Sequence, residues 1–182
     1  VSRRVLAAMR RGGDPESYAR MFACMRETVP GIALRTTFIA GFPSETEADF
    51  EELLSFVKEV EVDHLGVFPY SPEPGSGAEG LGDPIPARVK GERCAAVMEA
   101  QREISRRKNR LLKGKVHEAI LEGVSAESDL LLEGRLKRQA PEIDGKLLVN
   151  DVPEGFVPRP GAIVKVRVTE AHDYDLVGRV VA

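Results

Sequence analysis

Residues 32–39 form an apolar, β-branched run whose side chains could line a binding site for a small molecule. In a strand, the alternation of side chains puts Arg35, Thr37 and Ile39 on one face. An arginine can bind a carboxylate through two parallel N–H bonds, an isoleucine offers a flat apolar contact, and Gly41 lets the backbone approach a ligand closely. Two plainer interpretations stay open, in which Gly41 only forms a tight turn and Arg35 only makes an ion pair inside the protein.

A second apolar run, residues 64–70, carries the aromatic side chains Phe68 and Tyr70 toward a loop rich in proline and glycine. These rings could stack on a ligand or simply fill the mouth of a barrel. A helical pattern separates the two runs, and strand, helix, strand with short connections predicts a right-handed parallel unit. Ligands bind at the carboxyl ends of such strands, so residues 39–45 and 68–73 should be neighbours.

Other residue types that could do chemistry lack the required spacing. The three histidines are scattered without metal-ligand spacing. Cys24 and Cys94 lie far apart in helical patterns, where we expect buried, unreactive thiols. Glu45 fits an acid at the start of a helix better than a catalytic base. We therefore assign no metal ligand and no catalytic residue within this chain.

Helical spacing of apolar residues predicts the elements that surround the two strands. Helices are expected over residues 2–11, 14–29, 46–60 and about 86–112. Together with the strands they predict an α/β domain over residues 1–112, of the kind that forms part of a parallel barrel.

After residue 112, the helical spacing of apolar residues gives way to a pattern typical of short strands and turns. Strands are expected over residues 115–123, 129–138, 146–150, 162–170 and 176–181. Five short strands in so little chain predict a small, closed, antiparallel β-barrel resembling an OB-fold. The second domain is therefore predicted over residues 113–182.

Composition restricts the class of protein. The chain has 182 residues, 42% of them hydrophobic and 30% charged, which suits a folded core, and it contains no apolar run long enough for a membrane span or a signal peptide. We expect a cytoplasmic protein that does not contact a membrane. The net charge is −3, and residues 112–182 carry ten Lys and Arg against twelve Asp and Glu, so we expect at most weak RNA binding and favour a protein partner.

Three stretches carry a resemblance to a known family. They are residues 5–11 (VLAAMRR), 34–47 (LRTTFIAGFPSETE) and 67–73 (VFPYSPE), which are similar to the later barrel segments of the radical S-adenosylmethionine methylthiotransferases. The C-terminal part looks like a TRAM domain. Within the family, the chain resembles the branch that modifies a ribosomal protein more than the tRNA-modifying branch, on the basis of Glu73 and of residues 140–145 and 173–178.

The resemblance implies a two-cluster radical enzyme. Such an enzyme cleaves S-adenosylmethionine on a 4Fe-4S cluster, abstracts hydrogen from an aspartate β-carbon of the small-subunit ribosomal protein S-twelve, and installs a methylthio group; a second 4Fe-4S cluster handles the sulfur donor. By resemblance, the cofactor pocket would contain Arg35, Thr37, Ile39, Gly41, Phe68 and Tyr70. The TRAM domain would dock the ribosomal protein, with candidate residues Glu142, Asp144, Tyr174 and Asp175.

Two departures from the family pattern shape these expectations. Ser44 replaces the usual glycine of the turn, and the three-cysteine motif that binds the radical cluster is absent, so the ligands of both clusters are missing. We therefore expect the chain to be the C-terminal portion of the enzyme and to be inactive alone. The alternatives are a tRNA methylthiotransferase and a non-catalytic module that binds protein or RNA.

Overall fold

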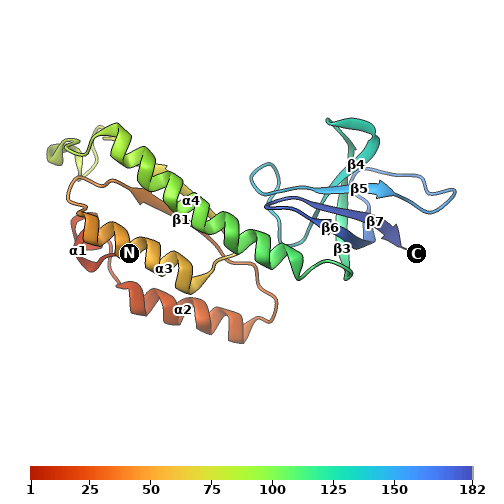
Figure 1. Ribbon diagram of the computed structural model, residues 1–182, viewed down its shortest axis with the longest axis horizontal. Coiled ribbons are helices and arrows are strands. Elements are labelled where there is room, and N and C mark those ends of the chain that lie inside the picture. Colours follow the sequence, from red (N-terminus) through yellow and green to blue (C-terminus); the bar gives the residue numbers. More distant parts are fainter. Residues whose placement is uncertain (182) are drawn as a thin grey trace. The chain divides into compact units, whose positions relative to one another are not determined.

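The computed structural model describes residues 1–181, and the chain divides into two compact units (Figure 1). The first is Val1–Ile104 and the second begins at Ser105. The division lies inside a long helix, whereas the predicted domain boundary lies just after that helix. Each unit is described by itself.

The first unit alternates helices and strands in the predicted order. Its elements are α1 (Arg3–Ala8), α2 (Pro15–Thr28), β1 (Arg35–Ala40), α3 (Glu47–Val60), β2 (His64–Pro69), the 3₁₀ turn η1 (Glu79–Leu81) and α4 (Ala87–Arg110), which continues into the second unit.

Local signals explain where these helices begin and end. The carboxylate of Asp14 accepts the N–H of Ser17 at 2.7 Å and caps α2. Thr46 and Asp49 form a capping box at the start of α3, since each side chain accepts a hydrogen bond from the other residue's N–H. Helix α1 ends earlier than predicted, and Arg10 adopts a φ of 56° just beyond it, which a helix does not allow.

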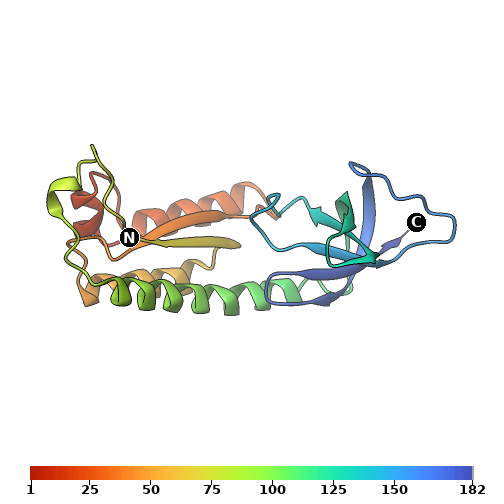
Figure 2. The ribbon, with the colours of Figure 1, turned by 90° about the horizontal axis from the view of Figure 1, so that it is seen from above.

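Strands β1 and β2 pair in parallel, with Thr37 opposite Gly66 and Ile39 opposite Phe68. Helices α3 and α4 lie along the same side of both strands (Figure 2). Between them and the strands lies the core of this unit, which consists of Leu34, Phe50, Leu53, Phe56, Val57, Val60, Val62, Leu65, Val97, Ala100 and Ile104. This packing leaves the other face of the strands open.

The second unit is a closed barrel of five strands. They are β3 (Val116–Ser125), β4 (Ser128–Leu136), β5 (Leu147–Asp151), β6 (Ile163–Ala171) and β7 (Leu176–Val181). Around the barrel the order is β3, β4, β5, β7, β6. The core is aliphatic and includes Leu121, Leu136, Leu147, Val149, Val166, Val168 and Leu176.

The prediction of a fully antiparallel barrel is wrong at one pair. Four strand pairs are antiparallel, but β5 and β7 run parallel, with Leu147 opposite Leu176. The reason is parity, because strand directions cannot alternate all the way around a closed ring with an odd number of strands. The long connection over residues 152–162 carries the chain from β5 to β6, which are not neighbours in the ring. Strand β7 then occupies the place between them.

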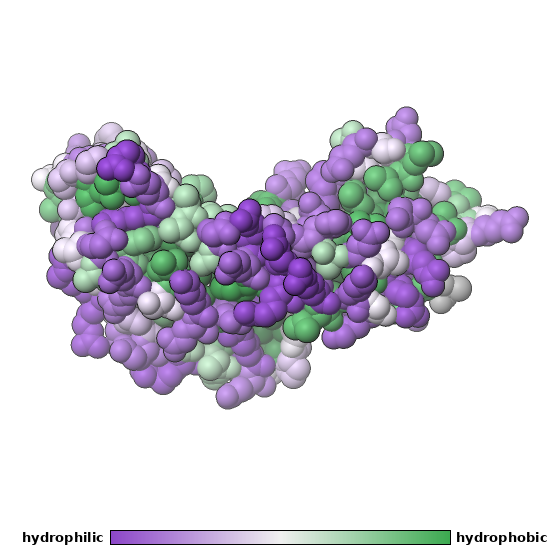
Figure 3. Space-filling model, viewed as in Figure 1, coloured by the Kyte–Doolittle hydropathy of each residue, from purple (hydrophilic) through white to green (hydrophobic). Residues whose placement is uncertain are grey.

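Exposed apolar side chains gather on the β3–β4 hairpin (Figure 3). Val124 and Leu130 are 58% and 89% exposed. The tip of this hairpin lies at the end of β4 opposite to the loop that follows Leu136. In the part of the chain that the structure describes, no helix has the length and apolar character needed to cross a membrane.

Candidate functional site

The open face of β1 and β2 brings together four of the six residues predicted to bind a cofactor. Arg35, Thr37 and Ile39 all lie on the exposed side of β1, as the alternation predicts. Ile39 is 40% exposed and Phe68, its neighbour on β2, is 61% exposed. Neighbouring residues in a parallel register point to the same face, so Ile39 and Phe68 form one apolar surface beside the polar residues. Such a surface suits a flat ring with polar substituents.

Gly41 serves the turn and the neighbouring helix. Its φ is +80°, and a β-carbon at this position would collide with the side-chain stem of Lys90 on α4. Its N–H is donated to the Glu45 carboxylate at 2.8 Å. The close approach at Gly41 is therefore made by Lys90, and the interpretation of this residue as a turn glycine explains its geometry.

Tyr70 is separated from the open face. Its ring packs against Phe42 with the ring centroids 5.3 Å apart, in a small cluster that also contains Val5. The side chain is buried, and its hydroxyl finds no hydrogen-bond partner among the described residues. Its backbone carbonyl accepts a hydrogen bond from Lys90 Nζ at 2.9 Å. Tyr70 thus fills the end of β2, as the plainer interpretation of its ring expects.

Glu45 has a role that differs from the predicted one. Helix α3 begins at Glu47 with Thr46 as its cap, so Glu45 precedes the helix. Its carboxylate is buried and lies 2.7 Å from the Arg93 guanidinium, which also contacts Glu47 at 2.9 Å. Burial raises the pKa of Glu45, while the Gly41 N–H and Arg93 oppose that rise. Glu45 is therefore part of a buried polar network and not an acid that serves the helix dipole.

The Arg93 contact was missed from the sequence, although a signal was present. Arg93 falls in the apolar stripe of α4, between Val89 and Ala96. A charge within a stripe that faces the core needs a buried partner. The sequence does not identify this partner, because Glu45 is distant from Arg93 along the chain and several other acidic residues lie near Glu45.

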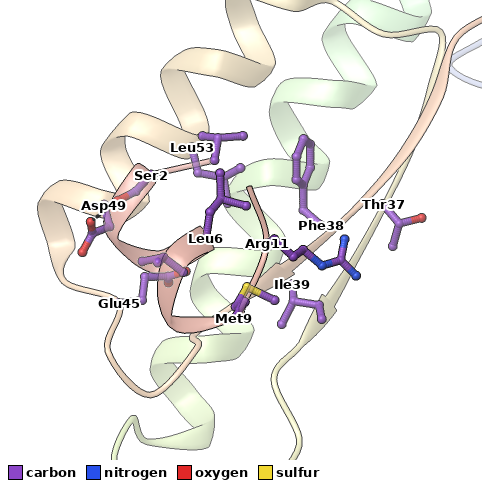
Figure 4. Close-up of a pocket in the computed structure, with 12 residues that line it drawn as sticks. Ser2, Leu6, Met9, Arg11, Thr37, Phe38, Ile39, Glu45, Asp49 and Leu53 are labelled. Carbon is purple, nitrogen blue, oxygen red and sulfur yellow. Dashed lines mark hydrogen bonds between the residues drawn. The ribbon is translucent and has the colours of Figure 1, made fainter. Parts of the chain in front are cut away.

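A cavity of about 220 Å³ lies between α1 and the end of β1 (Figure 4). Thr37 and Ile39 of β1, Met9 and Arg11 from the segment that follows α1, and Glu45 contribute to its wall. The carboxyl end of β1 is thus a hollow, partly polar region next to the open strand face.

The candidate docking residues in the second unit lie on two loops that touch. Asp175 accepts the N–H of Lys146 at 2.7 Å, and the backbone N–H of Leu176 bonds the carbonyl of Lys146 at 2.9 Å. Gly145 lies so close to the backbone of Tyr174 that a β-carbon would overlap the tyrosine carbonyl. Residues 140–146 and 172–176 therefore form one ordered pair of loops.

The docking candidates have different roles within these loops. The Asp144 carboxylate accepts the N–H of Ala140 at 2.6 Å, so Asp144, like Asp175, shapes its loop. Glu142 is exposed in a left-handed conformation with φ of 63°. Beside it in sequence, Ile143 is 73% exposed, and Tyr174 is 41% exposed. The loops thus hold an acidic, an aliphatic and an aromatic side chain in contact with solvent.

The cysteines differ from the predicted pair of buried thiols. Cys24 is exposed, because α2 contributes no fully buried residue to the core, and Cys94 is partly buried. Burial and the charge of Glu45 raise the pKa of the Cys94 thiol. Within residues 1–181, no group of three His, Cys, Asp or Glu side chains is arranged to hold a metal ion.

Comparison with known families identifies the second unit. Residues 114–181 match the family model described as TRAM domain. The barrel of β3 to β7 is therefore a TRAM domain, joined in this chain to an α/β unit with one open strand face.

The chain is also similar over its whole length to curated proteins named ribosomal protein uS12 methylthiotransferase RimO. The protein of Solibacter usitatus is 47% identical over 182 residues, which is 100% of this chain and 39% of that protein. The protein of Syntrophobacter fumaroxidans is 49% identical over 174 residues, 95% of this chain and 38% of the relative. That of Geobacter sulfurreducens is 42% identical over 182 residues, 100% and 40% respectively. The chain is thus similar to these proteins along nearly its whole length and spans about two fifths of the length of these relatives.

Proposed function

We propose that this chain is the C-terminal part of a methylthiotransferase that acts on ribosomal protein uS12, the protein called S-twelve above. The observation that carries the proposal is the 47% identity to a protein of that name across all 182 residues. In this proposal the α/β unit supplies one wall of an S-adenosylmethionine pocket, and the TRAM domain docks the substrate protein. Because ribosomes lie in the cytoplasm, a cytoplasmic location is part of this proposal.

The open strand face fits the adenosyl part of the cofactor. Ile39 and Phe68 offer an apolar surface for the adenine ring, while Arg35 and Thr37 supply polar groups at the same face. When bound, S-adenosylmethionine and the 4Fe-4S clusters would supply the radical and the sulfur. The two cysteines of this chain cannot ligate two clusters, so other segments of the intact protein would have to provide the ligands.

Activity of the intact enzyme and of this chain tests the catalytic proposal. We expect an intact family member containing these residues, reconstituted with iron and sulfide, to release 5′-deoxyadenosine and to methylthiolate uS12. The 182-residue chain treated in the same way should release none. Stoichiometric iron uptake with 5′-deoxyadenosine release by the chain alone would contradict its assignment as an inactive part.

The exposed side chains of the paired loops support protein docking. Aromatic side chains are favoured anchors of protein interfaces, and Tyr174 is held on a backbone that is already ordered by Gly145 and Lys146. We therefore propose that Tyr174, Ile143 and Glu142 contact uS12, while Asp144 and Asp175 keep the loops in shape.

Binding of the 182-residue chain to purified uS12 and to tRNA tests this surface. Tyr174→Ala and Ile143→Ala should each weaken uS12 binding about tenfold, the loss expected for an interface anchor. Leu130→Ala is the matched control, since Leu130 is an equally apolar, exposed residue at the far end of β4. Equal losses in the control and the loop variants would rule out the loops as the specific docking surface.

RNA is the alternative partner. Burial lowers the pKa of His117, and the charges of Lys115, Arg138 and Lys137 lower it further. We expect this local charge to give only weak, salt-sensitive tRNA binding. Tighter binding of tRNA than of uS12 would favour the tRNA-modifying alternative, and binding of either without catalysis by the intact protein would favour a non-catalytic module.

A further inference from the structure

Two buried cations on α4 reach the carboxyl ends of both strands of the first unit. Lys90 and Arg93 lie one helical turn apart and are 5% and 7% exposed. Burying a charge carries a large desolvation penalty, and a well-packed apolar residue would often stabilise a core as well. These two side chains therefore call for a role that an apolar pair could not fill.

Arg93 holds the end of β1 through Glu45. One guanidinium nitrogen of Arg93 lies 2.7 Å from the Glu45 carboxylate, and the same carboxylate oxygen accepts the N–H of Gly41 at 2.8 Å. The guanidinium also lies over the ring of Phe50, 5.3 Å from its centroid. A directional chain of contacts thus runs from α4 to the backbone just after β1.

Lys90 holds the end of β2. Its Nζ donates to the backbone carbonyl of Tyr70 at 2.9 Å and to the carboxylate of Asp83 at 2.7 and 2.9 Å. Its aliphatic stem fills the space that a side chain at position 41 would need. One side chain therefore touches the ends of both strands.

We infer that Lys90 and Arg93 are positioning residues that fix the carboxyl ends of β1 and β2 against each other and so hold the Ile39–Phe68 surface in register for the cofactor. The inference rests on the proposed function for its link to the cofactor. The claim that the two side chains fix the strand ends does not depend on the cofactor. A displacement of about 1 Å in a positioned group can cost about a hundredfold in rate, so a clamp at this place affects binding without touching the ligand.

The first experiment measures the strand ends in the 182-residue chain. Amide hydrogen exchange is followed by NMR at Gly41 and, as a reference for global unfolding, at the buried residue Val57. In Arg93→Met, the exchange rate at Gly41 should rise at least about tenfold more than the rate at Val57. The reason is that the end of β1 would then open locally without unfolding of the whole unit. Equal increases at both amides would show that Arg93 contributes only general stability and would overturn the inference.

The second experiment measures S-adenosylmethionine affinity in an intact family member that contains these residues. Lys90→Met keeps an aliphatic side chain against Gly41 but loses the hydrogen bonds of Nζ. Arg93→Lys keeps the positive charge but loses the two-pronged guanidinium that contacts both Glu45 and Glu47. Each should raise the dissociation constant at least about fivefold at a temperature where the variant is fully folded. The matched control is Arg26→Met, because Arg26 donates hydrogen bonds to the backbone carbonyls of Val60 and Glu61, at the C-terminal end of α3.

The outcomes separate the two proposals. Wild-type affinity in both clamp variants, or the same loss in Arg26→Met, would overturn the positioning role. Failure of the wild-type intact protein to bind S-adenosylmethionine would contradict the proposed function instead, and the exchange experiment would still decide whether the clamp exists.

Discussion

Gly145 and Tyr174 are packed backbone to backbone, and a β-carbon at position 145 would overlap the carbonyl of Tyr174. Gly145→Ala must push the two loops apart, which in a well-packed region costs about 1–3 kcal/mol. We expect a lower unfolding temperature of the barrel, measured through the NMR signals of the buried methyl groups of Val166. Ile143→Ala, an exposed change in the same loop, should stay within about 0.5 kcal/mol of wild type. Matching losses in both variants would contradict the packing explanation.

The buried Glu45–Arg93 pair predicts strongly non-additive effects on stability. Glu45→Met or Arg93→Met alone leaves one buried charge without its main partner and should lower the free energy of unfolding by about 3–5 kcal/mol. The double variant removes both charges and should recover a large part of that loss. Urea unfolding of the four proteins measures the coupling. Additive losses would show that the two side chains act independently.

Asp49 predicts a loss of stability in acid. Burial opposes its ionisation, but hydrogen bonds from Ser2 and Thr46 and the Arg4 guanidinium hold its pKa well below the ordinary value of 3.8. The folded state therefore binds this proton less readily than the unfolded chain, so the stabilisation is present above about pH 4 and is lost as the pH falls further.

The variant Asp49→Asn tests this pH dependence. It should be less stable than wild type at pH 7, and the difference should shrink as the pH falls from about 4 to 2. The free energy of unfolding from urea titrations at each pH measures this. Glu51→Gln, at an exposed position of α3, should follow the wild-type curve. A constant difference across the whole pH range would contradict the role of ionised Asp49.

Two glycines of the first unit should respond to alanine with opposite signs. Gly41 has a φ of +80° and contacts the Lys90 stem, so Gly41→Ala should destabilise the unit by about 2 kcal/mol or more. Gly91 is exposed in α4 with nothing within 4 Å of a β-carbon, so Gly91→Ala should stabilise it by about 0.5–1 kcal/mol. Thermal unfolding of both variants checks the signs, and destabilisation by both would show that Gly41 is not special.

The open strand face was predictable because it depends on local alternation. The positions of Arg35, Thr37 and Ile39 relative to one another follow from the geometry of a single strand. The neighbouring position of Phe68 follows from a parallel pair with a short helical connection. The alternation of side chains in a strand and the order of the elements are therefore enough to predict that these four side chains lie on one face.

The features that the sequence left open or did not predict depend on partners distant in sequence. The burial of Tyr70 depends on Phe42 and Val5, and the role of Glu45 depends on Arg93, which is 48 positions further along the chain. The parallel β5–β7 pair follows from the closure of an odd number of strands, a property of the whole ring that no individual strand pattern contains.

The position of β7 in the barrel determines when the second unit can fold. Of the five strands, β7 comes last in sequence, yet it lies between β5 and β6 and closes the ring. During synthesis, the earlier strands therefore leave the ribosome with two unpaired edges until residues 176–181 are released. Such edges pair readily with other chains. The TRAM barrel thus depends on its last strand for protection from aggregation while the protein is being made.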